Sequence, residues 1–296
     1  MKKYKYIFKA IENVKTVSDE GFNYQNIRDG EQSGDTIRLA QGQYMSASEW
    51  AKLNPNDRHL ARIIAHARTL RDPIFSHRSA AIIHGIETLS VPDRLQVLGS
   101  GGASNIDLQY RQDEPSHRAT IMAVPGGIRV IDPLTAVIGS VRETDFAEGM
   151  VIAESALQSL PEITYDELHA SLMAVRRCRG AKNAHRVAAA MSTLSASPAE
   201  TLARVALLNL GLKPTQQHLI PTPLKAFRVG AALIEHGVVV EVTNTQQRAS
   251  IQDALAEESR AEAIRGEGWE FVQLTWADVR YNPATVRHKL HRLGVL

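Results

Sequence analysis

The chain has 296 residues, of which 44% are hydrophobic and 22% are charged, and its formal net charge is +2. These proportions are typical of a folded protein of two or more domains and exclude a disordered or fibrous chain. Its one cysteine, Cys178, excludes an internal disulfide and a cysteine-based zinc site. Because no apolar run is long enough to span a bilayer and no apolar segment follows the Lys-rich start, we expect a cytoplasmic protein without membrane contact.

The net charge is too small to indicate a nucleic-acid-binding protein by itself, so local clusters of charge matter more. The densest basic stretch covers residues 176–186, which include no acid, and a second lies at 280–292. Each stretch is either a solvated helix face or a phosphate-contacting face, and the sequence leaves both interpretations open.

Residues 1–48 predict helices followed by a hairpin. Apolar residues at helical spacing between Tyr6 and Val14 predict the first helix. A later helix begins at Asn23, which is suited to cap it, and ends at Gly34. Two strands then follow, around residues 36–39 and 42–45. Helices followed by a two-stranded hairpin are the order of a winged helix.

Residues 49–193 predict an α+β middle domain. Its expected elements, in chain order, are a long helix over 48–70, a helix opening near Ser76, strands at 95–98 and 119–124, and helices over 144–193. In the last part we expect Pro161 to separate two helices and Gly180 to interrupt a third.

Residues 194–296 predict a third domain. Ser197-Pro198-Ala199-Glu200 is a capping box with proline at the first helical position, and Gly211 ends that helix. The next expected elements are strands at 226–234 and 238–242, a helix over 250–265, a strand at 269–275 and a helix over 283–293. The order α, β, β, α, β, α suits a mixed sheet flanked by helices. The predicted fold class is therefore α/β, with several domains.

Two stretches carry motifs that occur together in one family. In the first, a helix from Asn23, a turn at Ser33-Gly34-Asp35 and the segment Gly42-Gln43-Tyr44 follow one another. The second reads Ser76-His77-Arg78-Ser79-Ala80-Ala81-Ile82-Ile83-His84-Gly85, and Asp132-Pro133 follows. In order and spacing the chain resembles the AbiEi-like antitoxin proteins of bacteria. This resemblance implies an N-terminal winged helix and a C-terminal domain related to very-short-patch-repair endonucleases, of the PD-(D/E)XK restriction-endonuclease type.

The second motif has a structural interpretation and a catalytic one. Ser76 is suited to cap the helix, and the small Ala80 and Ala81 allow another element to approach closely. His77 and His84 are then packed or hydrogen-bonded helix residues rather than a catalytic pair, and we favour this interpretation.

Nucleases of this type hold Mg²⁺ with an acid at the end of one strand and a glutamate on the next, and a lysine follows. The resemblance places Gly230 at the position of the metal-binding Asp and matches Glu241 to the glutamate. Thr243 and Asn244 stand where the family has Asp and Gly, and no lysine follows. We therefore expect Glu241 to be a lone polar group at a strand end.

Glu200 matches a further glutamate that the family carries on the preceding helix, although the capping box is the interpretation we favour. At most two carboxylates then remain, without the central Asp and the Lys. The expectation is a nuclease fold without catalysis, metal or cofactor.

Candidate DNA-contacting residues lie in residues 1–48. Asn and Gln pair bidentately with adenine and Arg with guanine, while a wing residue meets phosphate or the minor groove. The candidates for the recognition helix are Asn23, Tyr24, Gln25, Arg28 and Gln32, and the candidate on the wing is Arg38. One observation opposes this assignment, because the basic residues of this segment are balanced by acids between Glu12 and Glu49.

The expected function is that of a DNA-binding transcriptional regulator of antitoxin type, with double-stranded DNA as its partner. Two alternatives stay open. The first is an interaction protein that neutralises a toxin without binding DNA. The second is a metal-dependent DNA endonuclease with a displaced active site.

Overall fold

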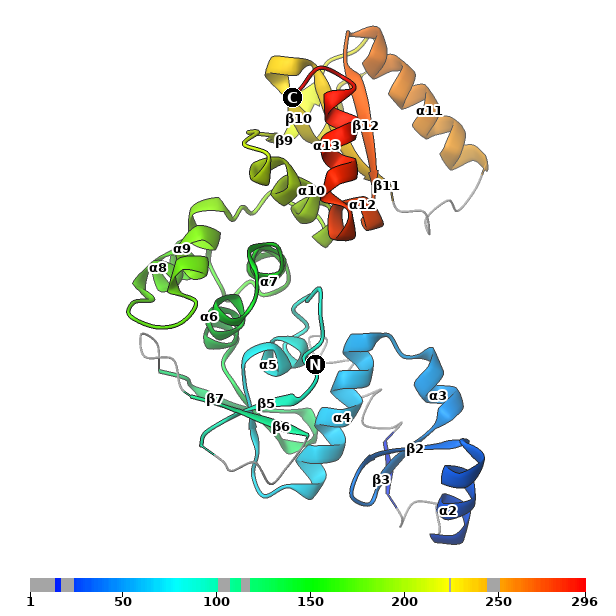
Figure 1. The fold of residues 1–296 in the computed structure, drawn as a ribbon, viewed down its shortest axis with the longest axis vertical. Helices are drawn as coiled ribbons and strands as arrows, with labels where there is room; N and C mark the ends of the chain where they lie inside the picture. The colour runs from blue at the N-terminus through cyan, green and yellow to red at the C-terminus, as the bar shows by residue number, and fades with distance from the viewer. Residues whose placement is uncertain (1–13, 17–23, 101–106, 113–117, 224, 244–250) are drawn as a thin grey trace. The chain divides into compact units, whose positions relative to one another are not determined.

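A computed structural model describes residues 14–16, 24–100, 107–112, 118–223, 225–243 and 251–296 (Figure 1). The chain divides into two compact units, residues 1–191 and residues 192–296. The described residues form twelve α-helices and sheets of three, five and four strands, so the fold is mixed α/β. Within these residues no helix combines the length and the apolar character that crossing a membrane requires.

The first described elements of unit 1 form a small antiparallel sheet. Its order is β1-β3-β2, from β1 (Lys15–Thr16), β2 (Thr36–Ala40) and β3 (Gln43–Ser46), and α2 (Tyr24–Ser33) precedes the hairpin. A Cβ added at Gly30 would lie 2.4 Å from Thr36 Oγ1, so α2 packs closely on β2. The predicted later helix and the hairpin are confirmed, while the helix expected after Tyr6 lies outside the described residues.

The hairpin shares a hydrophobic core with the next helices. Leu39 and Met45 belong to the same buried cluster as Leu60 and Ile64. The single helix expected over 48–70 is wrong, because two helices lie there, α3 (Ala47–Lys52) and α4 (Pro55–Thr69). The side chain of Asn54 accepts from the backbone N–H of Asp57 at 2.9 Å, and Pro55 occupies the first helical position, so the break has a local cause.

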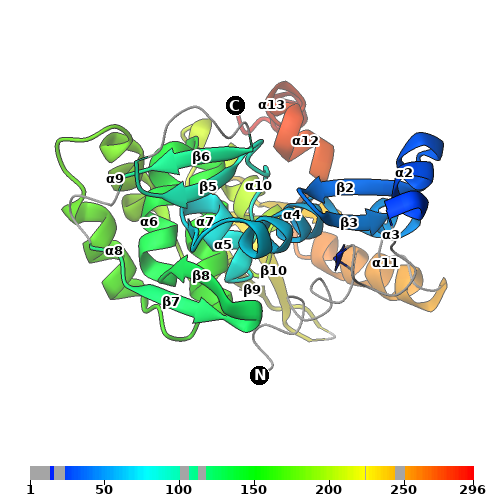
Figure 2. The same cartoon turned by 90° about the horizontal axis from the view of Figure 1, so that it is seen from below.

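A five-stranded mixed sheet forms the centre of unit 1. Its order is β6-β5-β4-β8-β7, from β4 (Ile74–Phe75), β5 (Leu95–Leu98), β6 (Leu108–Arg111), β7 (Ile121–Val124) and β8 (Ile128–Ile131). The pairs β5–β6 and β4–β8 are parallel and the other two pairs are antiparallel. Figures 1 and 2 show α4 and α5 (His77–Ile83) alongside this sheet.

Helices complete unit 1 beyond α5. They are α6 (Pro133–Glu143), α7 (Phe146–Ser159), α8 (Tyr165–Ala174) and α9 (Ala181–Ala190). Pro161 lies between α7 and α8, as predicted. Gly180 does not interrupt a helix. It is the N-cap of α9, with φ at +85°, a conformation that favours glycine.

Unit 2 is a four-stranded sheet with helices. The order is β12-β11-β10-β9, from β9 (Thr215–Ile220), β10 (Phe227–Leu233), β11 (Val238–Thr243) and β12 (Glu270–Thr275), and only β11–β12 is parallel. The helices are α10 (Pro198–Asn209), α11 (Ile251–Gly266), α12 (Trp276–Tyr281) and α13 (Pro283–His291). The predicted order of elements was incomplete, because it lacked β9 and α12.

Two apolar layers bury the unit 2 sheet. One contains Leu207 of α10, Leu274 of β12 and Leu290 of α13. The other contains Val239 of β11 and Ile264 of α11. Away from the turn that joins β10 to β11, Gly230 and Glu241 line one cavity with Glu200 of α10. These are three of the candidate nuclease positions.

Candidate functional site

The candidate recognition residues that the structure describes lie on the solvent side of α2. Gln25, Arg28 and Gln32 are exposed, and Ile27 between them is buried at 4% exposure. Spacings of three and four residues place the three polar side chains on one face of the helix. Asn23 lies outside the described residues, and Tyr24 opens α2.

Acids share this exposed face. Gln25 Nε2 donates to Asp29 Oδ1 at 2.9 Å, so the amide is already engaged. Glu31 and Asp35 are also exposed. The face is therefore polar and mixed in charge, as the sequence indicated, rather than uniformly basic.

Arg38 is exposed on β2, where it lies opposite Tyr44 of β3 in the register. It lines a hollow of about 460 Å³ together with Trp50 and Arg62. The next residue of β2, Leu39, is buried, and because successive side chains of a strand point to opposite faces, the hairpin is anchored through Leu39 while Arg38 stays exposed.

Side chains of the motif from Ser76 to Gly85 make hydrogen bonds within the protein. His84 Nε2 lies 2.8 Å from the carbonyl oxygen of Ile131, and His59 Nε2 lies 2.8 Å from Ser79 Oγ. The expected cap is wrong, since Ser76 makes no side-chain cap bond and its Oγ is buried without a hydrogen-bond partner among the described residues. His77 and His84 are 7% and 2% exposed, so both are packed, as predicted.

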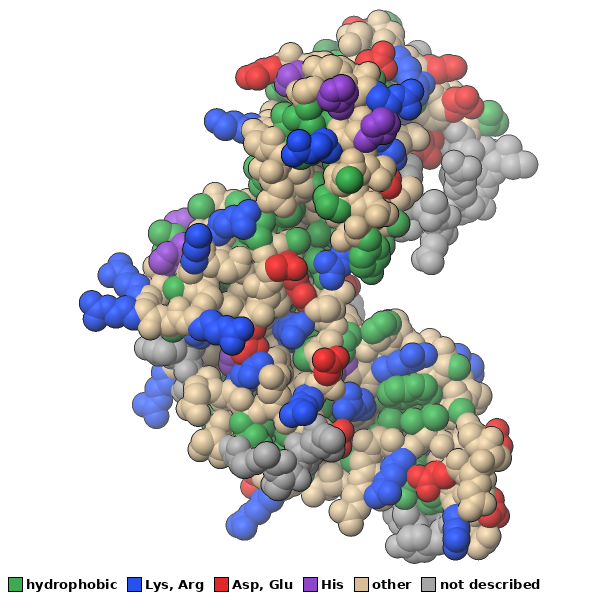
Figure 3. Space-filling view, in the orientation of Figure 1, with side chains coloured by type: hydrophobic (Ala, Val, Ile, Leu, Met, Phe, Trp, Pro, Cys, Tyr) green, Lys and Arg blue, Asp and Glu red, His purple; other side chains and the backbone are tan. Residues whose placement is uncertain are grey.

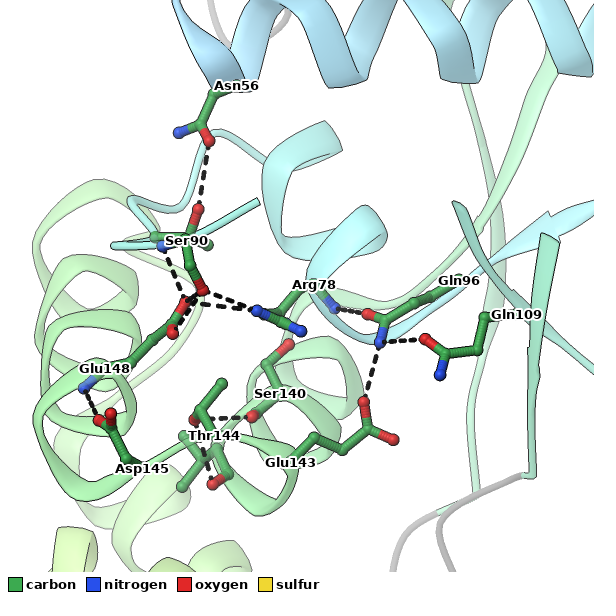
Figure 4. A network of polar contacts seen from close by, with 12 residues as sticks. Asn56, Arg78, Ser90, Gln96, Gln109, Ser140, Glu143, Thr144, Asp145 and Glu148 are labelled. Atoms are coloured by element: carbon green, nitrogen blue, oxygen red, sulfur yellow. Dashed lines mark hydrogen bonds and ion pairs between the residues drawn. The ribbon is translucent and has the colours of Figure 1, made fainter. Parts of the chain in front are cut away.

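A buried polar network surrounds the start of α5 (Figure 4). The backbone N–H of Arg78 donates to Gln96 Oε1, and Gln96 Nε2 donates to Glu143 Oε2, both at 2.9 Å. On the other side, Ser90 Oγ donates to the buried carboxylate of Glu148 at 2.7 Å. The network joins strands of the sheet to α6 and α7.

In unit 2 the structure brings Glu200, Gly230 and Glu241 to one cavity of about 170 Å³. The register pairs Ala231 with Val240, so Gly230 and Glu241 flank that pair at the same end. A Cβ added at Gly230 would lie 3.6 Å from Glu200 Cδ, an ordinary contact distance. Thr243 ends β11, and its side chain is outside what the structure describes.

Glu241 is not the lone polar group that the sequence predicted. Arg260 of α11 donates to both of its carboxylate oxygens, from Nη2 to Oε1 at 2.6 Å and from Nη1 to Oε2 at 3.1 Å. Arg260 Nη2 also donates to the carbonyl oxygen of Arg228 at 3.2 Å. The hydrogen bond to Glu241 raises the pKa of Arg260, so this guanidinium stays charged. Sequence reasoning missed this pair, because nineteen positions separate the two residues.

Glu200 is also engaged. Its Oε2 accepts from the backbone N–H of Ala196 at 2.9 Å, and its own N–H donates to Ser197 Oγ at 3.3 Å. These two bonds resemble the capping box that the sequence predicted. The difference is that Glu200 accepts from the N–H of Ala196 and not from that of the N-cap residue Ser197. Across the described residues, no group of three His, Cys, Asp or Glu side chains is placed to hold a metal ion.

Comparison with models of protein families finds no match to this chain, and comparison with curated proteins finds none either.

Proposed function

We propose that this protein is a sequence-specific DNA-binding regulator of antitoxin type, whose nuclease-like C-terminal unit does not cut DNA. One observation carries the proposal. The polar face of α2 is directly followed by a hairpin that presents Arg38 to solvent. A winged helix uses these two elements for the major groove and for the DNA backbone.

The absence of catalysis is supported by the chemistry of the unit 2 cavity. A Mg²⁺-dependent nuclease needs free carboxylates and a lysine-type group beside them. Arg260 occupies both oxygens of Glu241, Glu200 caps a helix, and Gly230 has no side chain. A resident guanidinium thus supplies the positive charge that a metal would bring.

The experiment is a binding titration of the full-length protein against specific and scrambled duplexes at several salt concentrations. Arg28→Ala should weaken specific binding by about 1–3 kcal/mol and relax the preference at one base pair. Arg38→Ala should weaken binding to all sequences alike and lower the salt dependence by about one charge. Full-length variants are required because Leu39 and Met45 share the core of α4, so deletion of the segment would expose that core.

The acids beside Arg28 favour one alternative, an interaction surface for a protein such as a toxin. Asp29 and Glu31 are exposed on α2. If neither arginine variant alters DNA binding while both release a co-expressed partner, the interaction function replaces the one proposed. Metal-dependent cutting that Glu241→Ala abolishes would instead select the nuclease.

A further inference from the structure

Unit 1 contains a polar hollow that is larger than the one beside Arg38. It lies between α5, β6, the end of α6 and the start of α9. Its volume is about 790 Å³, within the range of small-ligand sites. Among the lining residues that the structure describes, Glu143 is the one acid. Six lining residues are cationic, namely Arg78, Arg111, Arg142, Arg179, Lys182 and Arg186. Figure 3 shows Lys and Arg side chains gathered over the end of unit 1 that carries α8 and α9.

Two of these arginines are held at the base of the hollow. Arg78 Nη1 donates to Ser90 Oγ at 2.8 Å and lies 3.7 Å from Glu148 Oε1 (Figure 4). Arg111 Nε lies 2.6 Å from Glu143 Oε1. Side chains that are already held lose little conformational entropy when a ligand binds. These two are therefore preorganised to contact an anion.

The start of α9 closes one side of the hollow. Gly180 caps this ten-residue helix, and no side chain caps its first turn. Arg142 Nη2 donates to the carbonyl oxygen of Arg179 at 3.0 Å, which ties the start of α9 to the end of α6. Since a helix N-terminus carries partial positive charge and presents N–H groups, it adds to the attraction of an anion.

His77 lines the hollow beside Arg78, Arg111 and Arg142. It is 7% exposed, and its backbone is held at φ +49°, an uncommon conformation for histidine. Burial, followed by the charges of Arg111, Arg142 and Arg78, lowers its pKa to about 3. Glu143 Oε1 lies 3.8 Å from His77 Nε2.

We propose that this basic hollow binds the phosphate or pyrophosphate group of a small phosphorylated ligand. The proposal goes beyond the DNA-binding function and does not depend on it. Planar guanidinium groups recognise phosphate oxygens through paired hydrogen bonds, which suits a site built largely from arginine. The side chains of Arg78 and Arg111 are 18% and 24% exposed. A small anion that enters the hollow reaches them more readily than a rigid duplex does.

The test is calorimetric titration of the full-length protein with inorganic phosphate, pyrophosphate and mononucleotides, with a short duplex as a separate arm. Arg179→Gln and Lys182→Gln remove charge from exposed lining residues, so the fold should persist, as circular dichroism would check. Arg176→Gln is the matched control, because Arg176 is exposed in the same basic stretch but does not line the hollow.

Saturable pyrophosphate or mononucleotide binding that each lining variant weakens by about tenfold or more supports the proposal. The control should stay within about twofold, because a charge outside the hollow is largely screened. An equal loss in the control would indicate diffuse attraction and overturn the proposal. So would an effect of the lining variants on the duplex alone, or the absence of saturable binding. The DNA-binding function fails on different variants, Arg28→Ala and Arg38→Ala, so the two outcomes are separable.

Discussion

The side chains of Glu241 and Arg260 are 19% and 24% exposed and make a bidentate pair. Removal of one partner from a charged hydrogen-bonded pair that is this far out of solvent leaves the other charge unpaired, and this is expected to destabilise unit 2. The same pairing occupies the carboxylate that a nuclease would use for its metal. At this position the carboxylate is therefore engaged by a guanidinium of the protein itself.

Arg260→Gln should destabilise the protein more than Arg260→Gln combined with Glu241→Gln, because the single change leaves Glu241 partly buried and unpaired. A double-mutant cycle on urea unfolding should give a coupling free energy of about 1–3 kcal/mol. Additive effects of the two changes would contradict the importance of the pair.

Gly230→Asp should not restore cleavage of supercoiled DNA with Mg²⁺, since no lysine-type group accompanies the new carboxylate. It should lower the free energy of unfolding by about 1 kcal/mol or more relative to Gly230→Ala, because the added charge lies near Glu200 and Glu241. Gly230→Ala is the control, because a Cβ at this position makes only ordinary contacts. A variant that cuts DNA, or is as stable as the alanine control, would be the contrary result.

The buried histidines make stability depend on pH. Burial, followed by neighbouring arginines, lowers the pKa values of His59 and His77 from 6.5 to about 3. Below pH 6.5 the unfolded chain binds protons that the folded chain does not. Their stabilising effect is thus fully present above pH 6.5 and is lost as the pH falls toward 3.

His77→Asn should therefore reduce the pH dependence of the unfolding free energy between pH 4 and 6 by about 1.4 kcal/mol per pH unit. Asparagine suits the test because it tolerates the positive φ of this position. Urea unfolding of both proteins across this range gives the two slopes. Equal slopes would mean that His77 titrates normally in the folded protein.

At the scale of single elements, the start of α9 depends on Gly180. A Cβ there would lie 2.1 Å from the carbonyl oxygen of Arg142, and the φ angle is +85°. Gly34 has a similar φ of +82°, and a Cβ there would meet nothing within 4 Å. Substitution of Gly34 therefore measures the destabilisation caused by the positive φ angle alone. Substitution of Gly180 adds the destabilisation caused by the steric clash with Arg142.

Gly34→Ala should cost about 1 kcal/mol from its φ angle alone. Gly180→Ala should cost about 2 kcal/mol more, because α9 must also move away from α6. Thermal unfolding monitored by circular dichroism compares the two variants. Equal destabilisation would show that α9 is not packed against Arg142 as described.

Elements whose signals are local could be predicted from the sequence. The helix after Ser197 was predicted because its cap, its proline and its terminal Gly211 all lie within the element. The strand Thr215–Ile220 was missed because its polar run of Thr, Gln, Gln and His lacks alternating apolar residues. Only its pairing with β10 makes it a strand.

The candidate sites also divide into those that local sequence signals predict and those that depend on tertiary packing. The helix that carries Gln25, Arg28 and Gln32 was predicted from Asn23 and Gly34 at its ends, and all three side chains are exposed on it. The meeting of Glu200 with Gly230 was expected only from the family resemblance. The engagement of Glu241 by Arg260 could not be predicted, because it depends on where α11 packs. The cationic hollow combines residues from positions 77 to 186, so no local sequence motif predicts it.

At the scale of the whole molecule, two units with different chemistry occur on one chain. Unit 1 presents the polar face of α2, the hairpin with Arg38, and the cationic hollow. Unit 2 encloses a cavity in which carboxylates are neutralised or used as caps. The proposed function assigns DNA binding to unit 1 and no DNA cleavage to unit 2.

Sequence-specific DNA binding through α2 can be tested by selection from a pool of randomised duplexes. The full-length protein should enrich a defined motif. Arg28→Ala should lose the preference at one position of that motif, and Lys182→Gln should leave the motif unchanged. Failure of the full-length protein to enrich any motif, or a motif that Arg28→Ala leaves intact, would contradict the claim.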